Sequence, residues 1–246
     1  GTEHGYRIGL EYGMLASLAF IVPFVLFAPL AGNLGDRLPK HRVIRAVRLI
    51  DLPIILVGVV GLALGNVPLL CVALGLLGIA STFFSPVKYA IVPELVSAQR
   101  YDVANAWLQT VSVVAILAGG ALIAVADPQV LASIGLSKAV VVTLIAGGIA
   151  ACGLVAAWRI PAVPAQAPAT PLRPFAFAEQ FRALGSAPGV AAPALGLAGF
   201  WGLGAAISAM LAMLALQGWG LKEAGASAAG LALALGMIAG AVLSVR

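Results

Sequence analysis

The stretch GNLGDRLPKHR, residues 32–42, decides the fold because it separates two long apolar runs. Residues 14–32 precede it and residues 43–64 follow it, and both runs consist mainly of Leu, Ile, Val, Ala and Gly. Each run reaches the ~20 residues that a helix needs to cross the hydrocarbon core of a bilayer. The sequence therefore predicts two membrane-spanning helices joined by a short charged loop over residues 33–42.

The composition extends this prediction to the whole chain. Of the 246 residues, 62% are hydrophobic and 9% are charged, whereas about 25% of the residues of a soluble domain are charged. The apolar runs show no alternation of polarity, so they predict helices and not the strands of an outer-membrane barrel. We therefore predict an all-α, polytopic membrane protein. Seven spans are expected, at about residues 14–32, 43–64, 68–89, 105–126, 138–158, 190–216 and 225–245.

The basic residues are divided unevenly between the two ends of these spans. Eleven of the 14 Lys and Arg residues fall on one side of the membrane and three on the other. By the positive-inside rule, the side with eleven faces the cytoplasm. The loops at 33–42, 90–104 and 159–189 are therefore predicted to be cytoplasmic. The net charge of +5 then reports orientation in the membrane, and no nucleic-acid partner is expected.

Residues 32–42 resemble the loop motif G-x-L-x-D-R-x-G-R-[KR] of the major facilitator superfamily, which joins that family's second and third helices. Pro39 stands in the place of the motif's second glycine, Lys40 takes the following basic position, and His41 departs from the pattern. The resemblance implies a helical carrier built from two repeated six-helix halves.

A second segment, STFFSPVKYAIVPEL at residues 81–95, is similar to the lysophospholipid transporter branch of that superfamily. Asn105-Ala106 at the head of the next span fits the same pattern. The segment also resembles the membrane part of fused acyltransferase/acyl-carrier-protein synthetase chains. The loop motif thus points to the superfamily, and the FFSPVKY segment points to the branch.

The resemblance covers helices two to eight of a twelve-helix protein, so we expect a fragment without helix one and helices nine to twelve. Residues 1–158 are then a first helical bundle that lacks its first helix. Residues 159–189 are a Pro-rich cytoplasmic linker, and residues 190–246 hold the first two helices of a second bundle.

The loop residues are expected to form a gate. A carboxylate among guanidinium groups at a membrane interface forms a charge network that can latch one bundle against the other, and breaking that latch accompanies alternating access. A plain positive-inside anchor is the alternative, but it does not require the acid or the flanking glycines. The expected gating residues are Gly32, Gly35, Asp36, Arg37, Lys40 and Arg42.

Asp51 is the deepest acid in a span, eight residues from Val43, or about 12 Å along a helix. A charge at that depth is costly and marks a candidate functional site. Arg48 lies three residues earlier on the same helical face and can neutralise it. Structural pairing and a role in the transport path both remain open.

Further candidates for the transport path or for headgroup binding follow in the sequence. Lys88, which lies between Pro86 and Tyr89, is positioned to hold the phosphate of a lipid headgroup or simply to reach the interface. Glu94 lies close to it in sequence. Asn105 and Gln109 fall on one face of the next span, where they line a cavity or join helices.

No metal site is supported, because no His, Cys or acidic cluster has a ligand spacing, and no cofactor is expected. The favoured function is that of a secondary transporter, not an enzyme. By resemblance, it moves lysophospholipid, above all lysophosphatidylethanolamine, across the bacterial inner membrane. The expected partners are the lipid bilayer, an amphiphilic or lysophospholipid substrate, and an acyltransferase that is separate or fused. Two alternatives stay open: a proton- or cation-coupled exporter of hydrophobic compounds, and the membrane module of a fused acyltransferase.

Overall fold

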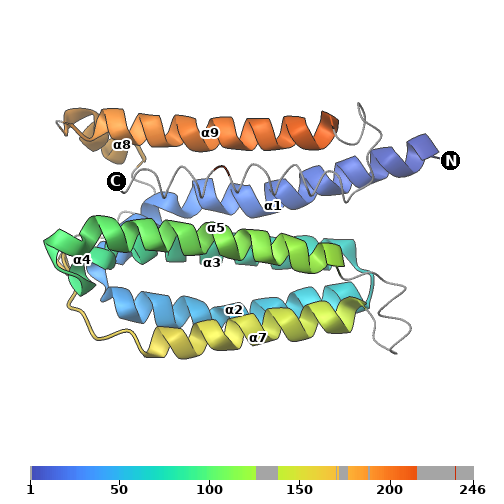
Figure 1. The fold of residues 1–246 in the computed structure, drawn as a ribbon, viewed down its shortest axis with the longest axis horizontal. Coiled ribbons are helices and arrows are strands. Elements are labelled where there is room, and N and C mark those ends of the chain that lie inside the picture. Colours follow the sequence, from blue (N-terminus) through green and yellow to red (C-terminus); the bar gives the residue numbers. More distant parts are fainter. Residues whose placement is uncertain are drawn as a thin grey trace. The chain divides into compact units, whose positions relative to one another are not determined.

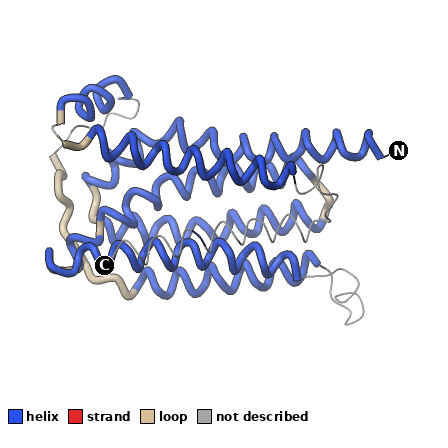
Figure 2. The backbone as a smooth tube through the Cα atoms, turned by 45° about the horizontal axis from the view of Figure 1, so that its top comes forward, coloured by secondary structure: helices blue, strands red, loops and turns tan. Residues whose placement is uncertain are grey.

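The computed structural model describes residues 2–125, 138–169, 171, 177–187, 189–214 and 236. Within these ranges all regular structure is helical, and Figure 2 shows no strand among them. The prediction of an all-α membrane protein is therefore confirmed. Contacts divide the chain into two compact units, Gly1–Leu95 with Leu136–Phe177 and Val96–Gly135 with Ala178–Arg246.

The first unit is organised around α3. This helix packs along both α1 and α2, and α2 in turn packs against α7, so that α2 and α7 lie side by side in Figure 1. By contrast, α1 and α2 contact each other little. The helices of this unit are α1 (Thr2–Arg37), α2 (Lys40–Ala63), α3 (Val67–Ala90), the single turn α4 (Val92–Leu95) and α7 (Lys138–Trp158).

Four segments of the described chain are long and apolar enough to cross a membrane: Met14–Arg37, Lys40–Ala63, Val67–Ala90 and Val140–Trp158. A bent pair, Phe177–Ser186 with Ala191–Gly204, is a fifth candidate. Helices suit this setting because they satisfy their backbone hydrogen bonds internally, where no water is present to do so. The first, second, third and fifth expected spans are thus accounted for in the first unit.

The predicted loop over 33–42 is wrong in its extent. Only Leu38 and Pro39 lie outside the helices, because α1 continues to Arg37 and α2 begins at Lys40. Pro39 has no N–H to donate, yet its carbonyl accepts from the Arg42 N–H at 2.8 Å, which starts α2. The expected gating residues therefore stand on the last turns of α1 and the first turn of α2.

At the other end of α2, the tight turn before α3 has clear local causes. Gly65 adopts φ +60°, a conformation that glycine takes readily. Asn66 then caps α3, its side-chain oxygen accepting the Leu69 N–H at 3.0 Å. Pro68 follows in the first turn of the helix, where a missing donor costs nothing.

Close packing of α3 depends on small residues. A Cβ added at Gly78 would collide with the Phe20 carbonyl of α1, and one at Gly35 would lie 3.0 Å from Cγ2 of Val87. Small residues let helix backbones approach closely in lipid. Gly32, in contrast, has open space around it.

The second unit contains a 3-10 turn, Ala98–Arg100, and helices α5 (Tyr101–Val125), α8 (Phe177–Ser186, which begins at the unit boundary) and α9 (Ala191–Met213). Helices α5 and α9 correspond to the expected spans at 105–126 and 190–216. The expected span at 225–245 lies outside the described residues except for Gly236, and so does the connection at 127–137.

Candidate functional site

A buried ion pair lies at the end of the first unit where α1 meets α2, which we call the basic end. Lys40, only 1% exposed, donates from Nζ to Oε1 of Glu94 on α4. The same oxygen accepts a hydrogen bond from Nε2 of Gln166 at 2.8 Å. Glu94 is thus held by Lys40, which is 54 residues away in the sequence. A buried charge is tolerated because it is paired in this way.

Residues 160–167, which we call the strap, run across the basic end and bind both of its helices. The Ala167 N–H donates to the Asp36 carbonyl at 2.9 Å, and the buried Val163 N–H donates to Nδ1 of His41 at 3.1 Å. The strap therefore ties the first segment of the predicted linker to α1 and α2.

Arg45 anchors the point where α7 ends and the strap begins. Its guanidinium donates to the carbonyls of Ala157 at 3.2 Å and Ile160 at 2.8 Å, and it stacks over the Trp158 ring at 5.0 Å. The sequence did not predict these contacts of Arg45, His41 and Gln166. The one local signal was that His41 occupies a position where the loop motif has a base.

The other gating candidates differ in exposure. Asp36 and Arg42 have exposed side chains, Gly32 and Arg37 are half-buried, and Gly35 is buried. Asp36 takes no part in the Lys40–Glu94 and Arg48–Asp51 ion pairs of the described residues. The gating network around Asp36 stays a prediction.

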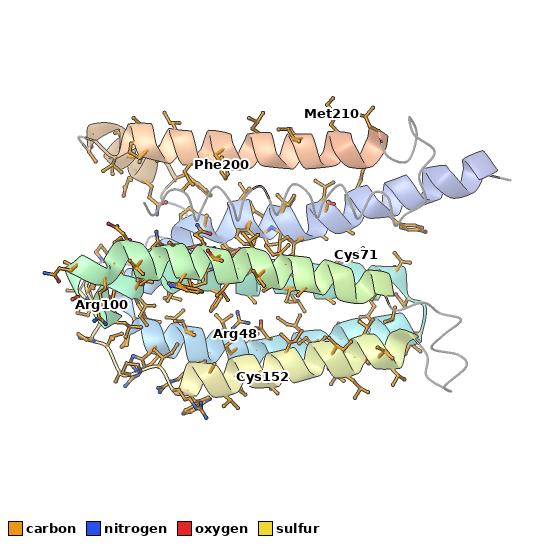
Figure 3. The ribbon with its side chains drawn as sticks, in the orientation of Figure 1. Arg48, Cys71, Arg100, Cys152, Phe200 and Met210 are labelled. Atoms are coloured by element: carbon orange, nitrogen blue, oxygen red, sulfur yellow. The ribbon has the colours of Figure 1, made fainter. Side chains whose placement is uncertain are left out.

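A second charged group lies deeper among the helices. Nη1 of Arg48 is 2.8 Å from Oδ2 of the buried Asp51, and its guanidinium stacks over Phe84 of α3 at 4.0 Å. Arg48 is eight residues beyond the first residue of α2, or about 12 Å along the helix. The stem of Arg48 lies beside Gly153 of α7, where an added Cβ would be 3.5 Å from the Arg48 Cδ. In Figure 3, Arg48 and Cys152 lie at a similar level on the neighbouring helices α2 and α7.

Lys88 adds a further positive charge to this group. Its Nζ lies 4.7 Å from the centre of the Tyr89 ring, and its charge and that of Arg48 repel each other. The Arg48 Nε is buried and has no hydrogen-bond partner among the described residues. We call the group formed by Arg48, Asp51 and Lys88 the cation cluster.

Asn105 and Gln109 are both half-buried on α5, four residues apart on one side of that helix. Their neighbours Thr110 and Ser112 bond back to the carbonyls of Ala106 and Leu108, at 2.9 and 2.7 Å. Such bonds satisfy hydroxyl groups inside the helix itself. The role of Asn105 and Gln109 in a transport path stays a prediction.

No group of three or more His, Cys, Asp or Glu residues that could hold a metal ion occurs among the described residues.

The first unit consists of long apolar helices. Its charges lie at the basic end, where the strap binds, and in the cation cluster. This arrangement defines a polytopic helical membrane protein. The family model of the Major Facilitator Superfamily matches residues 7–246, nearly the whole chain. The chain belongs to the Major Facilitator Superfamily. Members of this family are secondary transporters built from two repeated halves.

Curated relatives are similar over part of the chain. The lysophospholipid transporter LplT of Enterobacter sp. (strain 638) is 32% identical over 130 residues, which are 51% of this chain and 30% of that protein. LplT of Photorhabdus laumondii is 32% identical over 105 residues, 43% of this chain and 25% of the relative. LplT of Salmonella paratyphi B is 33% identical over 121 residues, 48% and 28% respectively. The matched region thus spans less than a third of these relatives, and no solved structure matches the chain.

Proposed function

We propose that this chain forms part of a secondary transporter that moves lysophospholipid across the bacterial inner membrane by alternating access. In this proposal the headgroup phosphate is held by Arg48 and Lys88. The observation that carries it is the cation cluster, which has two bases and one acid among apolar helices.

The chemistry of the two bases favours a phosphate. Guanidinium and ammonium groups bind phosphate oxygens through short, charge-assisted hydrogen bonds. The aromatic rings of Phe84 and Tyr89 beside the two cations provide apolar surface for the rest of an amphiphile. Similarity to proteins named lysophospholipid transporters supports the same substrate class.

The gate belongs to the basic end. Asp36 and Arg42 are exposed there, beside the buried Lys40–Glu94 pair and the strap. Exposed charges on rigid helix ends suit a contact that is made in one state of the carrier and broken in the other. In this proposal Asp36 and Arg37 form the gating contact, while Lys40 and Glu94 keep their own helix ends in place.

The test is uptake of labelled lysophosphatidylethanolamine by spheroplasts that lack their own transporter and express the protein at full length. Lys88→Met removes one of the two proposed phosphate ligands, so we expect uptake to fall at least about tenfold, since a charged hydrogen bond contributes ~1.5–3 kcal/mol. Arg159→Gln, an exposed base at the end of α7, is the matched control and should retain uptake.

Uptake by the Lys88→Met protein equal to that of the unaltered protein, at equal amounts in the membrane, would contradict the headgroup assignment. If the unaltered protein shows no lysophospholipid uptake but exports a hydrophobic dye in a protonophore-sensitive manner, the exporter alternative is correct instead.

A further inference from the structure

An apolar groove of about 650 Å³ lies in the first unit along α2 and α3. Most of its described lining comes from residues 42–57 of α2 and 76–83 of α3, and α1 contributes Leu34. Leu34 and Leu38 close it at the basic end. Arg42 is the charged residue among the described residues that line the groove.

The groove has the length of a lipid tail. Along α2 it extends from Arg42 to Val57, 15 residues, or about 22 Å. The hydrocarbon core of a bilayer is ~30 Å thick, so one leaflet contributes about half of that. The groove therefore starts at the basic end and reaches past the depth of the adjacent leaflet.

We propose that this groove binds one acyl chain of an anionic diacyl phospholipid from the leaflet at the basic end, with the lipid phosphate on Arg42. The Arg42 side chain is exposed, and it makes no ion pair within the described part of the chain. A base at the mouth of an apolar groove matches a molecule with a negative head and an apolar tail. The positive-inside rule assigns this leaflet to the cytoplasm.

The size of the groove suits a lipid tail. Its volume of about 650 Å³ lies within the ~300–1,000 Å³ that is typical of ligand pockets.

This lipid site differs from the cation cluster. Arg48 does not line the groove; it pairs with Asp51, stacks on Phe84 and lies beside Gly153 of α7. The lipid in the groove is thus a resident membrane lipid and not the transported molecule. The proposal does not depend on the identity of the substrate.

The experiment places a photo-crosslinking amino acid at Ile50 in the full-length protein. The protein is reconstituted in nanodiscs of phosphatidylglycerol mixed with phosphatidylcholine, and the labelled lipid is identified by mass spectrometry. Leu49 is the matched control, because it lies one residue away, is 57% exposed against 52% for Ile50, and does not line the groove.

We expect phosphatidylglycerol to be enriched at Ile50 relative to Leu49. Arg42→Gln should reduce that enrichment about fivefold, from the ~1 kcal/mol that one base near the membrane surface contributes. Arg42→Lys should keep most of it, which separates loss of charge from misfolding.

Three results would overturn the proposal. Equal lipid labelling at Ile50 and Leu49, or no effect of Arg42→Gln, would mean ordinary contact with bulk lipid. A cross-link from Ile50 to another segment of the protein would mean that a helix fills the groove. Displacement of phosphatidylglycerol by lysophosphatidylethanolamine would mean that the groove belongs to the transported lipid.

Discussion

At the scale of single residues, the charges of the first unit divide into buried pairs and exposed groups. Lys40 and Glu94 are buried and depend on each other, whereas Asp36 and Arg42 face outward from the same end. Removing one partner of a buried pair leaves an uncompensated charge, while replacing both by apolar residues is far less costly. The buried pair therefore maintains the structure that presents the exposed charges.

We predict that Glu94→Leu or Lys40→Met alone lowers the free energy of unfolding by about 3–5 kcal/mol. The double variant should recover most of that loss, because no unpaired charge remains. Thermal unfolding in detergent measures both effects. Single variants as stable as the unaltered protein would show that the pair is not buried in the folded protein.

At the scale of elements, α3 is the helix that holds α1 and α2 together. Its approach to α1 is close at Gly78, where an added Cβ would meet the Phe20 carbonyl, and looser at Gly75, where a Cβ would lie 3.5 Å from the Ala19 carbonyl oxygen. Two glycines one helical turn apart in one interface thus have different steric requirements.

Gly78→Ala is expected to destabilise the first unit by about 1–3 kcal/mol, because a backbone atom of α1 has to move. Gly75→Ala should be neutral or slightly stabilising, since alanine favours a helix and ordinary contact distance is kept. Melting temperatures of the two variants in one detergent provide the comparison. A larger loss for Gly75→Ala than for Gly78→Ala would contradict the packing described for α1 and α3.

The sequence predicts the helices better than it predicts their ends and contacts. The span expected at 138–158 coincides with α7, because the apolar run of the sequence has the same bounds as the helix. The loop expected at 33–42 is a two-residue turn, since Asn33 to Arg37 continue the helical backbone after apolar composition has ended. The Arg48–Asp51 pair was predictable from its spacing of three residues.

Contacts between distant parts of the chain were not predictable in this way. Glu94 meets Lys40 from 54 residues away, and His41 meets Val163 from 122 residues away. Local periodicity carries no information about such pairs. They arise from the packing of α2 against α3 and α7, which brings the strap to the basic end.

At the scale of the whole molecule, the strap connects the helices of the first unit to the chain that follows. His41 accepts its hydrogen bond from the buried Val163 N–H, and Gln166 joins the Lys40–Glu94 pair. The strap is therefore bound to the same helix ends that carry the expected gate.

His41→Ala removes the acceptor of the Val163 N–H, and an unsatisfied buried donor costs ~1–3 kcal/mol. We predict that amide hydrogen exchange of residues 160–167 becomes faster by roughly tenfold. His41→Asn offers a side-chain oxygen near the position of Nδ1 and should restore slow exchange. Equal exchange in all three proteins would mean that His41 does not hold the strap.

The two-residue turn at Leu38-Pro39 has a mechanical consequence. Because two residues separate α1 from α2 and α3 packs along both, the helix ends that meet at this turn stay close together. Helix α2 has 24 residues and is about 36 Å long, so a tilt of about 10° about the turn displaces its far end by roughly 6 Å.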